Sequence, residues 1–164
     1  VPQPFLAAFV GSSCSSRLWF PDRTAAVIDW AARRGIATVL LGGSGDVDFA
    51  AEVKALAQAR TWSFAGKTSL RELIGIFRRA SAAFGPDSGP MHIAAAVGCP
   101  VVSLWGATSP ERSAPWGSED LVIAGHADCS PCYRQTCPIG RNCMQEITPE
   151  QVVARLISSD ARRR

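Results

Sequence analysis

The sequence contains no run of about 18 apolar residues, and it therefore predicts no transmembrane helix. It also lacks a strong charge of either sign. The formal net charge is +3, and three of the arginines form the very end of the chain at 162–164. A nearly neutral body argues against a nucleic-acid partner recognised through a basic patch. The hydrophobic fraction of 47% is typical of a folded protein and excludes a disordered one.

Internal repeats and low-complexity linkers are absent as well, and 164 residues is the length of one ordinary domain. We therefore expect a single domain over 1–164. The chain begins with Val1 rather than methionine, and its first apolar run starts at Phe5. These two features favour a piece of a longer protein.

Short apolar segments alternate with stretches that have helical patterning. The predicted strands cover 5–10, 37–41, 61–64, 82–84 and 101–104, and the predicted helices cover 21–34, 48–59, 70–80, 89–97 and 149–158. Ser69 should cap the helix at 70–80, with Glu72 at its third position in a capping-box pattern. This alternation is typical of an α/β fold with a parallel sheet and helices on both faces. Ligands of such sheets bind beyond the carboxyl ends of the strands. The polar loops 11–17, 42–46 and 85–89 all follow strands, so we expect them to line one crevice.

The turn after the strand at 82–84 is the most informative segment. Gly89 can cap the following helix and Pro90 fits its first turn, which leaves the N–H groups of Met91 and His92 free. Together with the helix dipole these groups form an anion site. The side chains expected around it are Asp87, Ser88 and His92. The alternative is an ordinary capped turn between a strand and a helix.

Two more loops carry candidate ligand groups. The loop 11–17 is rich in glycine and serine, so its N–H and O–H groups and the charge of Arg17 suit a phosphate. The loop 42–46 lacks the dinucleotide fingerprint GxGxxG, but Asp46 could accept hydrogen bonds from ribose hydroxyls. The alternatives are a solvated surface loop for 11–17 and a helix-capping role for Asp46. The loop 107–112 follows the last of these strands and could border the sugar.

Four of the six cysteines lie within one short segment, and this spacing suggests a zinc site, iron–sulfur ligation or two disulfides. The candidate ligands are Cys129, Cys132, Cys137 and Cys143. Prolines and a glycine make 129–143 a loop, and a structural or vestigial role is the alternative. We assign Cys14 and Cys99 to small isolated positions, and the five tryptophans to packing in the core or at its rim.

The sequence resembles the lipopolysaccharide heptosyltransferases, which form glycosyltransferase family 9. The resemblance runs from the first strand to about residue 156. The residues that carry it are Asp87–Ala96, Gly98, Pro100, Leu104–Gly106, Thr108 and Pro110. The cysteine-rich loop followed by Ile147–Val152 is similar to the C-terminal end of the heptosyltransferase II-like members.

The resemblance implies the C-terminal half of a GT-B glycosyltransferase, with a Rossmann-like donor-binding domain in this chain and the N-terminal acceptor domain absent from it. The donor would be ADP-heptose and the acceptor inner-core lipopolysaccharide. No cofactor would be required, although the cysteines leave a structural zinc as a candidate. The catalytic base would lie in the absent domain, so the isolated domain would be inactive. The location would be cytoplasmic, with peripheral association at the inner face of the inner membrane.

The resemblance also assigns roles to single residues. Arg17 stands where the family usually carries a lysine that contacts the donor phosphate, and an arginine keeps the charge but changes the geometry. Asp46 would hold the ribose, and Thr68 falls near an adenine contact. The phosphate-loop residues would be Ser12 and Ser13, and the residues around the diphosphate and sugar would be Asp87, Ser88, Gly89 and His92. Two other functions stay open: a non-catalytic nucleotide- or sugar-binding module, and a metal or redox module centred on the cysteine-rich loop.

Overall fold

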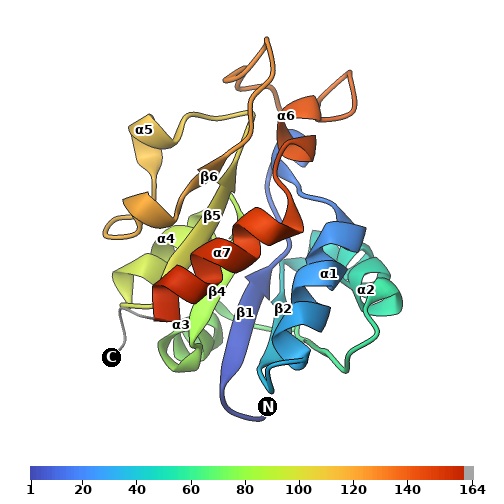
Figure 1. The fold of residues 1–164 in the computed structure, drawn as a ribbon, viewed down its shortest axis with the longest axis vertical. Helices are drawn as coiled ribbons and strands as arrows, with labels where there is room; N and C mark the ends of the chain where they lie inside the picture. The colour runs from blue at the N-terminus through green and yellow to red at the C-terminus, as the bar shows by residue number, and fades with distance from the viewer. Residues whose placement is uncertain (161–164) are drawn as a thin grey trace.

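A six-stranded sheet forms the centre of the computed structural model, which describes residues 1–160 (Figure 1). All the strand pairs are parallel, and the order across the sheet is β3-β2-β1-β4-β5-β6. The strands are β1 Phe5–Phe9, β2 Ala37–Leu41, β3 Trp62–Ser63, β4 Ala82–Pro86, β5 Val101–Trp105 and β6 Ile123–Ala124. The predicted Rossmann-like parallel sheet is confirmed, and β6 is a strand that the sequence analysis missed.

Helices cover both faces of the sheet. Figure 1 shows α1 and α7 in front of it and α3 and α4 behind it. The α-helices are α1 Pro21–Ala32, α2 Val47–Leu56, α3 Leu70–Arg79, α4 Gly89–Ala96, α5 Pro110–Ser113, α6 Asn142–Gln145 and α7 Pro149–Asp160. Three 3-10 helices are η1 Ser15–Arg17, η2 Ser44–Asp46 and η3 Glu119–Leu121. The helix predicted over 48–59 ends at Leu56, because Ala57 has an extended backbone with ψ 133°.

Buried strands explain why the apolar runs are continuous rather than alternating. Every residue of β1, β4 and β5 is buried. Successive side chains of a strand point to opposite faces. In β1, Leu6 and Ala8 therefore join the core under α1 and α7, whereas Phe5, Ala7 and Phe9 join the core under α3 and α4. Each face thus has its own hydrophobic core.

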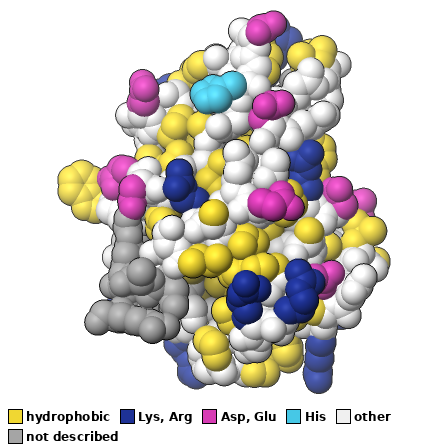
Figure 2. Space-filling view, in the orientation of Figure 1, with side chains coloured by type: hydrophobic (Ala, Val, Ile, Leu, Met, Phe, Trp, Pro, Cys, Tyr) yellow, Lys and Arg dark blue, Asp and Glu magenta, His cyan; other side chains and the backbone are white. Residues whose placement is uncertain are grey.

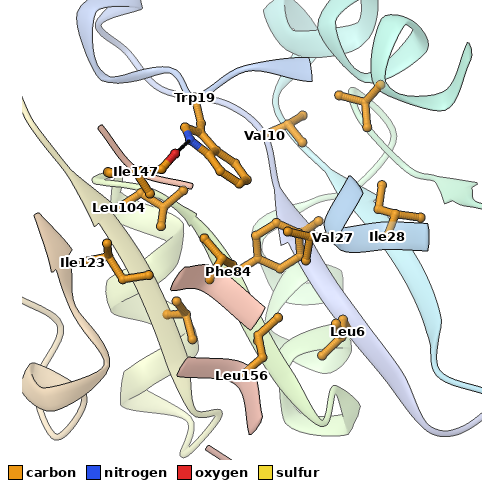
Figure 3. Close-up of a cluster of buried hydrophobic side chains, with 14 of the residues drawn as sticks. Leu6, Val10, Trp19, Val27, Ile28, Phe84, Leu104, Ile123, Ile147 and Leu156 are labelled. Atoms are coloured by element: carbon orange, nitrogen blue, oxygen red, sulfur yellow. Dashed lines mark hydrogen bonds between the residues drawn. The ribbon is translucent and has the colours of Figure 1, made fainter. Parts of the chain in front are cut away.

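The core on the α1 and α7 side also anchors the segment that leads from the first loop into α1. Figure 3 shows the Trp19 indole directed into this cluster near Leu104, with its Nε1–H donating to the carbonyl of Ile147 at 3.1 Å. Trp105 is also buried, as predicted. The prediction is wrong for Trp116, whose exposed fraction is 88%.

The start of α3 follows the predicted capping-box pattern. Ser69 is the N-cap, and its Oγ accepts a hydrogen bond from the N–H of Glu72 at 3.3 Å. The carboxylate of Glu72 in turn accepts the N–H of Ser69 at 2.8 Å. The two residues therefore pair two backbone N–H groups at the start of the helix with each other's side chains, and no other element takes part in these bonds.

The surface shows no field of one sign on the face in Figure 2, where basic and acidic side chains are interspersed. Within residues 1–160 no helix has the length and hydrophobicity needed to cross a membrane.

Candidate functional site

The carboxyl ends of β1, β2 and β4 border a pocket of about 610 Å³. β1 and β4 are neighbours in the sheet, although β2 and β3 come between them in the chain. The chain therefore leaves these two strands in opposite directions, which opens the crevice where α/β folds bind ligands. The pocket is lined by Phe9, Ser12, Ser13, Arg17, Gly43, Ser44, Gly45, Asp46, Asp87, Ser88, Gly89, Pro90 and His92. All the predicted donor-binding residues except Thr68 are among them.

Two glycines allow the loops around the pocket to approach one another. A Cβ atom at Gly11 would overlap the carboxylate of Asp46, which lies across the end of β1. A Cβ at Gly85 would overlap the carbonyl oxygen of Phe9 in the neighbouring strand. Asp46 Oδ2 also accepts the N–H of Gly43 at 2.7 Å. Asp46 therefore closes the short 3-10 helix η2 and lines the pocket, whereas its side chain makes no capping hydrogen bond to α2, the helix that it was expected to cap under the alternative interpretation.

An ion pair connects the loop after β1 with the loop after β4. Arg17 Nη1 lies 3.1 Å from Asp87 Oδ2, and their side chains are 25% and 9% exposed. The Oγ1–H of Thr108 donates to the same carboxylate oxygen at 2.8 Å. Asp87 thus holds the arginine at the mouth of the pocket, and Thr108 fixes the orientation of Asp87. A charge-assisted contact of this kind is stronger than a neutral one.

Two buried donors at this pocket have no protein partner. The Nε of Arg17 and the Oγ of Ser88 are both buried, and neither has a hydrogen-bond partner among residues 1–160. An unpaired buried polar group costs about 1–3 kcal/mol. A bound anion that accepted from both groups would remove this cost.

The start of α4 differs in detail from the expectation. Ser88, not Gly89, is the N-cap, and its side chain makes no capping bond. The N–H of Met91 donates to the carbonyl of Ser88 at 3.1 Å, so the prediction that this group is free is wrong. The reason is local, because the first turn of α4 closes on its own N-cap. Pro90 occupies the first turn as expected, and His92 lines the pocket.

Thr68 does not lie with the other predicted residues. It lines a second pocket of about 640 Å³ together with Phe64, Lys67 and part of α3. The loop that carries Thr68 nevertheless adjoins the first pocket, because the N–H of Gly66 donates to the carbonyl of Gly42 at 2.9 Å.

The four clustered cysteines are not gathered around a common point. In the described chain, no three or more histidine, cysteine or acidic side chains come together as a group that could hold a metal ion. All six cysteines are free thiols. Cys143 is buried against Gly106, and Cys137 Sγ accepts the N–H of Arg141 at 3.1 Å. This arrangement gives no support to the predicted zinc, iron–sulfur or disulfide cluster of Cys129, Cys132, Cys137 and Cys143.

Thr108 is a candidate site residue to which the sequence analysis gave no role of its own. Its loop follows β5 and was predicted to lie at the same edge of the sheet. That position was the one sequence feature that pointed to Thr108. The hydrogen bond to Asp87 joins residues 21 positions apart. A contact of that range depends on the pairing of β4 with β5, which sequence spacing alone does not reveal.

Comparisons with known proteins agree with this geometry. The model of the family described as glycosyltransferase family 9 (heptosyltransferase) matches residues 1–142. Lipopolysaccharide core heptosyltransferase OpsX of Haemophilus influenzae is 28% identical over 159 residues, which cover 88% of this chain and 46% of that protein. Lipopolysaccharide heptosyltransferase 3 of Escherichia coli K12 is 33% identical over 153 residues, with 88% and 44% covered.

Solved structures share the fold. ADP-heptose lipopolysaccharide heptosyltransferase II of E. coli superposes with a TM-score of 0.83 at 24% identity, covering 98% of this chain and 47% of that one. The dodecameric iron-containing heptosyltransferase TibC, solved in complex with ADP-D-β-D-heptose, gives a TM-score of 0.76 at 20% identity, with 99% and 46% covered. The chain spans about half the length of the curated relatives. Because the family model matches residues 1–142, this chain belongs to glycosyltransferase family 9.

Proposed function

We propose that this chain binds ADP-heptose and forms the donor-binding half of a GT-B glycosyltransferase that transfers heptose to inner-core lipopolysaccharide. Membership of family 9 supports the reaction class. The names of its relatives, which are lipopolysaccharide heptosyltransferases, support heptose as the sugar and lipopolysaccharide as the acceptor. The acceptor would bind mainly outside this chain, because the chain spans about half of those relatives.

The pair of unpartnered donors carries the proposal. Arg17 Nε and Ser88 Oγ are buried and unpaired, and both residues line the pocket where β1 and β4 diverge at the edge of the sheet. The N-terminus of the eight-residue helix α4 borders the same pocket. A helix N-terminus and an arginine both favour negative charge. A diphosphate supplies oxygens for the hydroxyl, the guanidinium and the helix end together.

This arrangement suits the departure of a nucleoside diphosphate. During transfer, the bond between the anomeric carbon of the sugar and the diphosphate oxygen breaks, and negative charge develops on the diphosphate. Preorganised donors at that position lower the barrier without reorganising. Arg17, Ser88 and the start of α4 would supply them.

The acceptor hydroxyl must also lose a proton, and Asp87 is poorly suited to take it. Its Oδ2 already accepts from Arg17 and Thr108, so the carboxylate is committed to positioning. We therefore propose that the base lies in the acceptor half of the full protein. The chain alone should bind the donor and transfer nothing.

Other parts of the proposal come from the family resemblance. The protein would act in the cytoplasm, peripherally at the inner face of the inner membrane, and would require no cofactor. Asp46 would hold the ribose, and Thr68 would contact the adenine. The metal or redox module centred on 129–143 receives no support from the positions of its cysteines.

Isothermal titration calorimetry with ADP, UDP, GDP and ADP-heptose tests the donor class. We expect ADP and ADP-heptose to bind more tightly than UDP and GDP, by about tenfold or more. Equal affinity for ADP, UDP and GDP would contradict the assignment of adenine as the nucleobase of the donor. Turnover of ADP-heptose by this chain alone would contradict the division of labour between the halves.

Asp46→Asn separates the ribose contact from the phosphate contacts. The amide keeps the size of the side chain but loses the charge that favours ribose hydroxyl donors. ADP affinity should fall by about tenfold, whereas inorganic pyrophosphate should bind with little change. An equal loss for both ligands would show that Asp46 acts on the phosphate side instead.

A further inference from the structure

One segment contacts both the loop that carries Arg17 and the loop that carries Thr108, the residue that donates a hydrogen bond to Asp87. We call residues 133–141 the bracing segment. In Figure 1 this stretch lies at the top of the molecule, close to the loop that follows β1. Hydrogen bonds show that the two are in contact.

The first contact is with the phosphate loop. The N–H of Ser16 donates to the carbonyl of Gln135 at 3.1 Å, and its Oγ–H donates to the carbonyl of Arg134. Ser16 is buried by these contacts, with an exposed fraction of 1%. The Oγ–H of Ser15 donates to the same Gln135 carbonyl at 3.3 Å. The backbone next to Arg17 is therefore held by main-chain oxygens of the bracing segment.

The second contact is with the loop after β5, which carries Thr108. The N–H of Tyr133 donates to the carbonyl of Ala107 at 2.7 Å. The next residue, Thr108, donates to Asp87. One end of the bracing segment is thus tied to the residue beside the group that orients Asp87.

The third contact closes the other end. Arg141 Nη1 donates to the carbonyls of Leu18 and Trp19, at 2.8 and 3.4 Å. Its guanidinium also lies 4.5 Å from the centre of the Phe20 ring. Arg141 therefore fixes the chain just beyond the phosphate loop.

An unusual backbone conformation occurs at both ends of the bracing segment. Tyr133 and Arg141 are the non-glycine residues with positive φ in the described chain, at 55° and 62°. This conformation is uncommon for residues with a Cβ and persists where surrounding contacts impose it. Both residues make the contacts that tie the bracing segment to the site loops.

We propose that the bracing segment is a positioning element of the donor site and that Arg141 is its main positioning residue. Arg141 does not line the pocket that contains Arg17 and Asp87. It acts by holding the phosphate loop so that Arg17 meets Asp87 and the diphosphate. This inference rests on the proposed function for the identity of the ligand. That the bracing segment fixes the phosphate loop follows from the hydrogen bonds alone.

A double-variant cycle tests this role. ADP affinity is measured by calorimetry for the wild-type chain, Arg141→Met, Arg17→Met and the double variant. Arg141→Met should weaken ADP binding by about tenfold, as is usual for groups that orient a binding residue. In the Arg17→Met background the same change should cost less than about twofold, because the residue that it positions is gone. Arg34→Met is the matched control, since Arg34 lies 4.5 Å over the Trp30 ring but touches neither loop.

Amide hydrogen exchange gives a second readout that needs no ligand. The Ser16 amide should exchange faster in Arg141→Met than in wild type, while the amides of β1 and β4 keep their protection. Arg141→Lys retains a charged donor and should restore part of the protection and the affinity. It also serves if Arg141→Met does not fold.

Two results would overturn the proposal. One is an unchanged exchange rate for the Ser16 amide in Arg141→Met. The other is an equal loss of ADP affinity with and without Arg17, which would mean that Arg141 does not act through it. If the wild-type chain fails to bind ADP, the proposed function fails, and the exchange rate still decides whether the segment braces the loop.

Discussion

Helices α3 and α4 both follow a serine N-cap, yet the two serines are used in opposite ways. Ser69 is exposed, and its hydroxyl and backbone are paired with Glu72 in a closed local arrangement. Ser88 is buried, makes no capping bond, and leaves its hydroxyl without a partner. The third position of α3 is the acidic Glu72, whereas the third position of α4 is the buried, uncharged Met91.

The difference separates a helix start that stabilises itself from one that is left open for a ligand. A carboxylate at the start of α3 satisfies the donors there. A carboxylate in the same place on α4 would compete with an anion in the pocket, and the first turn of α4 has none. The start of α3 borders no part of the Arg17–Asp87 pocket.

Removing one arginine beside each helix start should give the largest contrast: Arg17 reaches the start of α4 from the loop after β1, and Arg71 lies in the first turn of α3. Arg17→Met removes a charge-assisted contact worth about 1.5–3 kcal/mol, so ADP affinity should fall by roughly 10- to 150-fold. Arg71→Met makes the same change in the first turn of α3 and should leave ADP affinity unchanged. Calorimetric titration measures both. Similar losses of ADP affinity in the two variants would mean that binding depends on the net charge of the protein and not on the position of Arg17.

Replacing each serine by alanine should give opposite effects on binding and stability. Ser88→Ala should weaken ADP binding by about tenfold, the value of one hydrogen bond to a charged group. It breaks no bond within the protein, so stability should not fall. Ser69→Ala should lower stability, because it removes an N-cap, and leave binding unchanged.

Calorimetry and urea unfolding of both serine variants provide the measurement. A loss of stability in Ser88→Ala would show that its hydroxyl has a structural partner. Unchanged ADP affinity in that variant would remove Ser88 from the binding site.

The two helix starts also show how far sequence reasoning reaches. The Ser69–Glu72 pattern is local, so its spacing alone predicted the bonds that the structure contains. The turn between β4 and α4 was correctly predicted to lie at the pocket, because the predicted strands put 11–17, 42–46 and 85–89 at one edge of the sheet. The first turn of α4 was predicted less well, since closure on the Ser88 carbonyl depends on backbone angles that the sequence does not specify.

Long-range contacts could not be predicted. The bond between Ser16 and Arg134 spans 118 residues, and no spacing rule points to it. The cysteine pattern predicted that 129–143 forms a cluster of thiols. This segment is instead a loop, with positive φ at Tyr133 and Arg141, that is hydrogen-bonded to other segments of the chain. Trp116 was assigned to packing by residue type, whereas burial depends on what the loop faces.

The capping box should also leave a small trace in the pH dependence of stability. Hydrogen bonds from the Ser69 hydroxyl and backbone lower the pKa of Glu72 below its ordinary value of 4.5. A carboxyl whose pKa is lower in the folded state stabilises the fold above its unfolded pKa, and this contribution is lost as the pH falls through the lowered value. The effect should be small because Glu72 is exposed to solvent.

Thermal unfolding between about pH 3 and pH 6 measures this contribution. In Ser69→Ala the pKa of Glu72 should rise toward 4.5, and the difference in stability from wild type should shrink as the pH falls. Ser88→Ala is the control and should parallel wild type throughout. A Glu72 titration that is the same in wild type and Ser69→Ala would contradict the assigned cause.

The central claim is that the start of α4, not that of α3, receives the diphosphate. Backbone amide chemical shifts recorded during titration with inorganic pyrophosphate test it most directly, because this ligand has no base or sugar. We predict that the amides of residues 12–17 and of Ser88 and Gly89 shift, while those of residues 69–73 do not. Shifts at 69–73 with none at Ser88 and Gly89 would contradict the account.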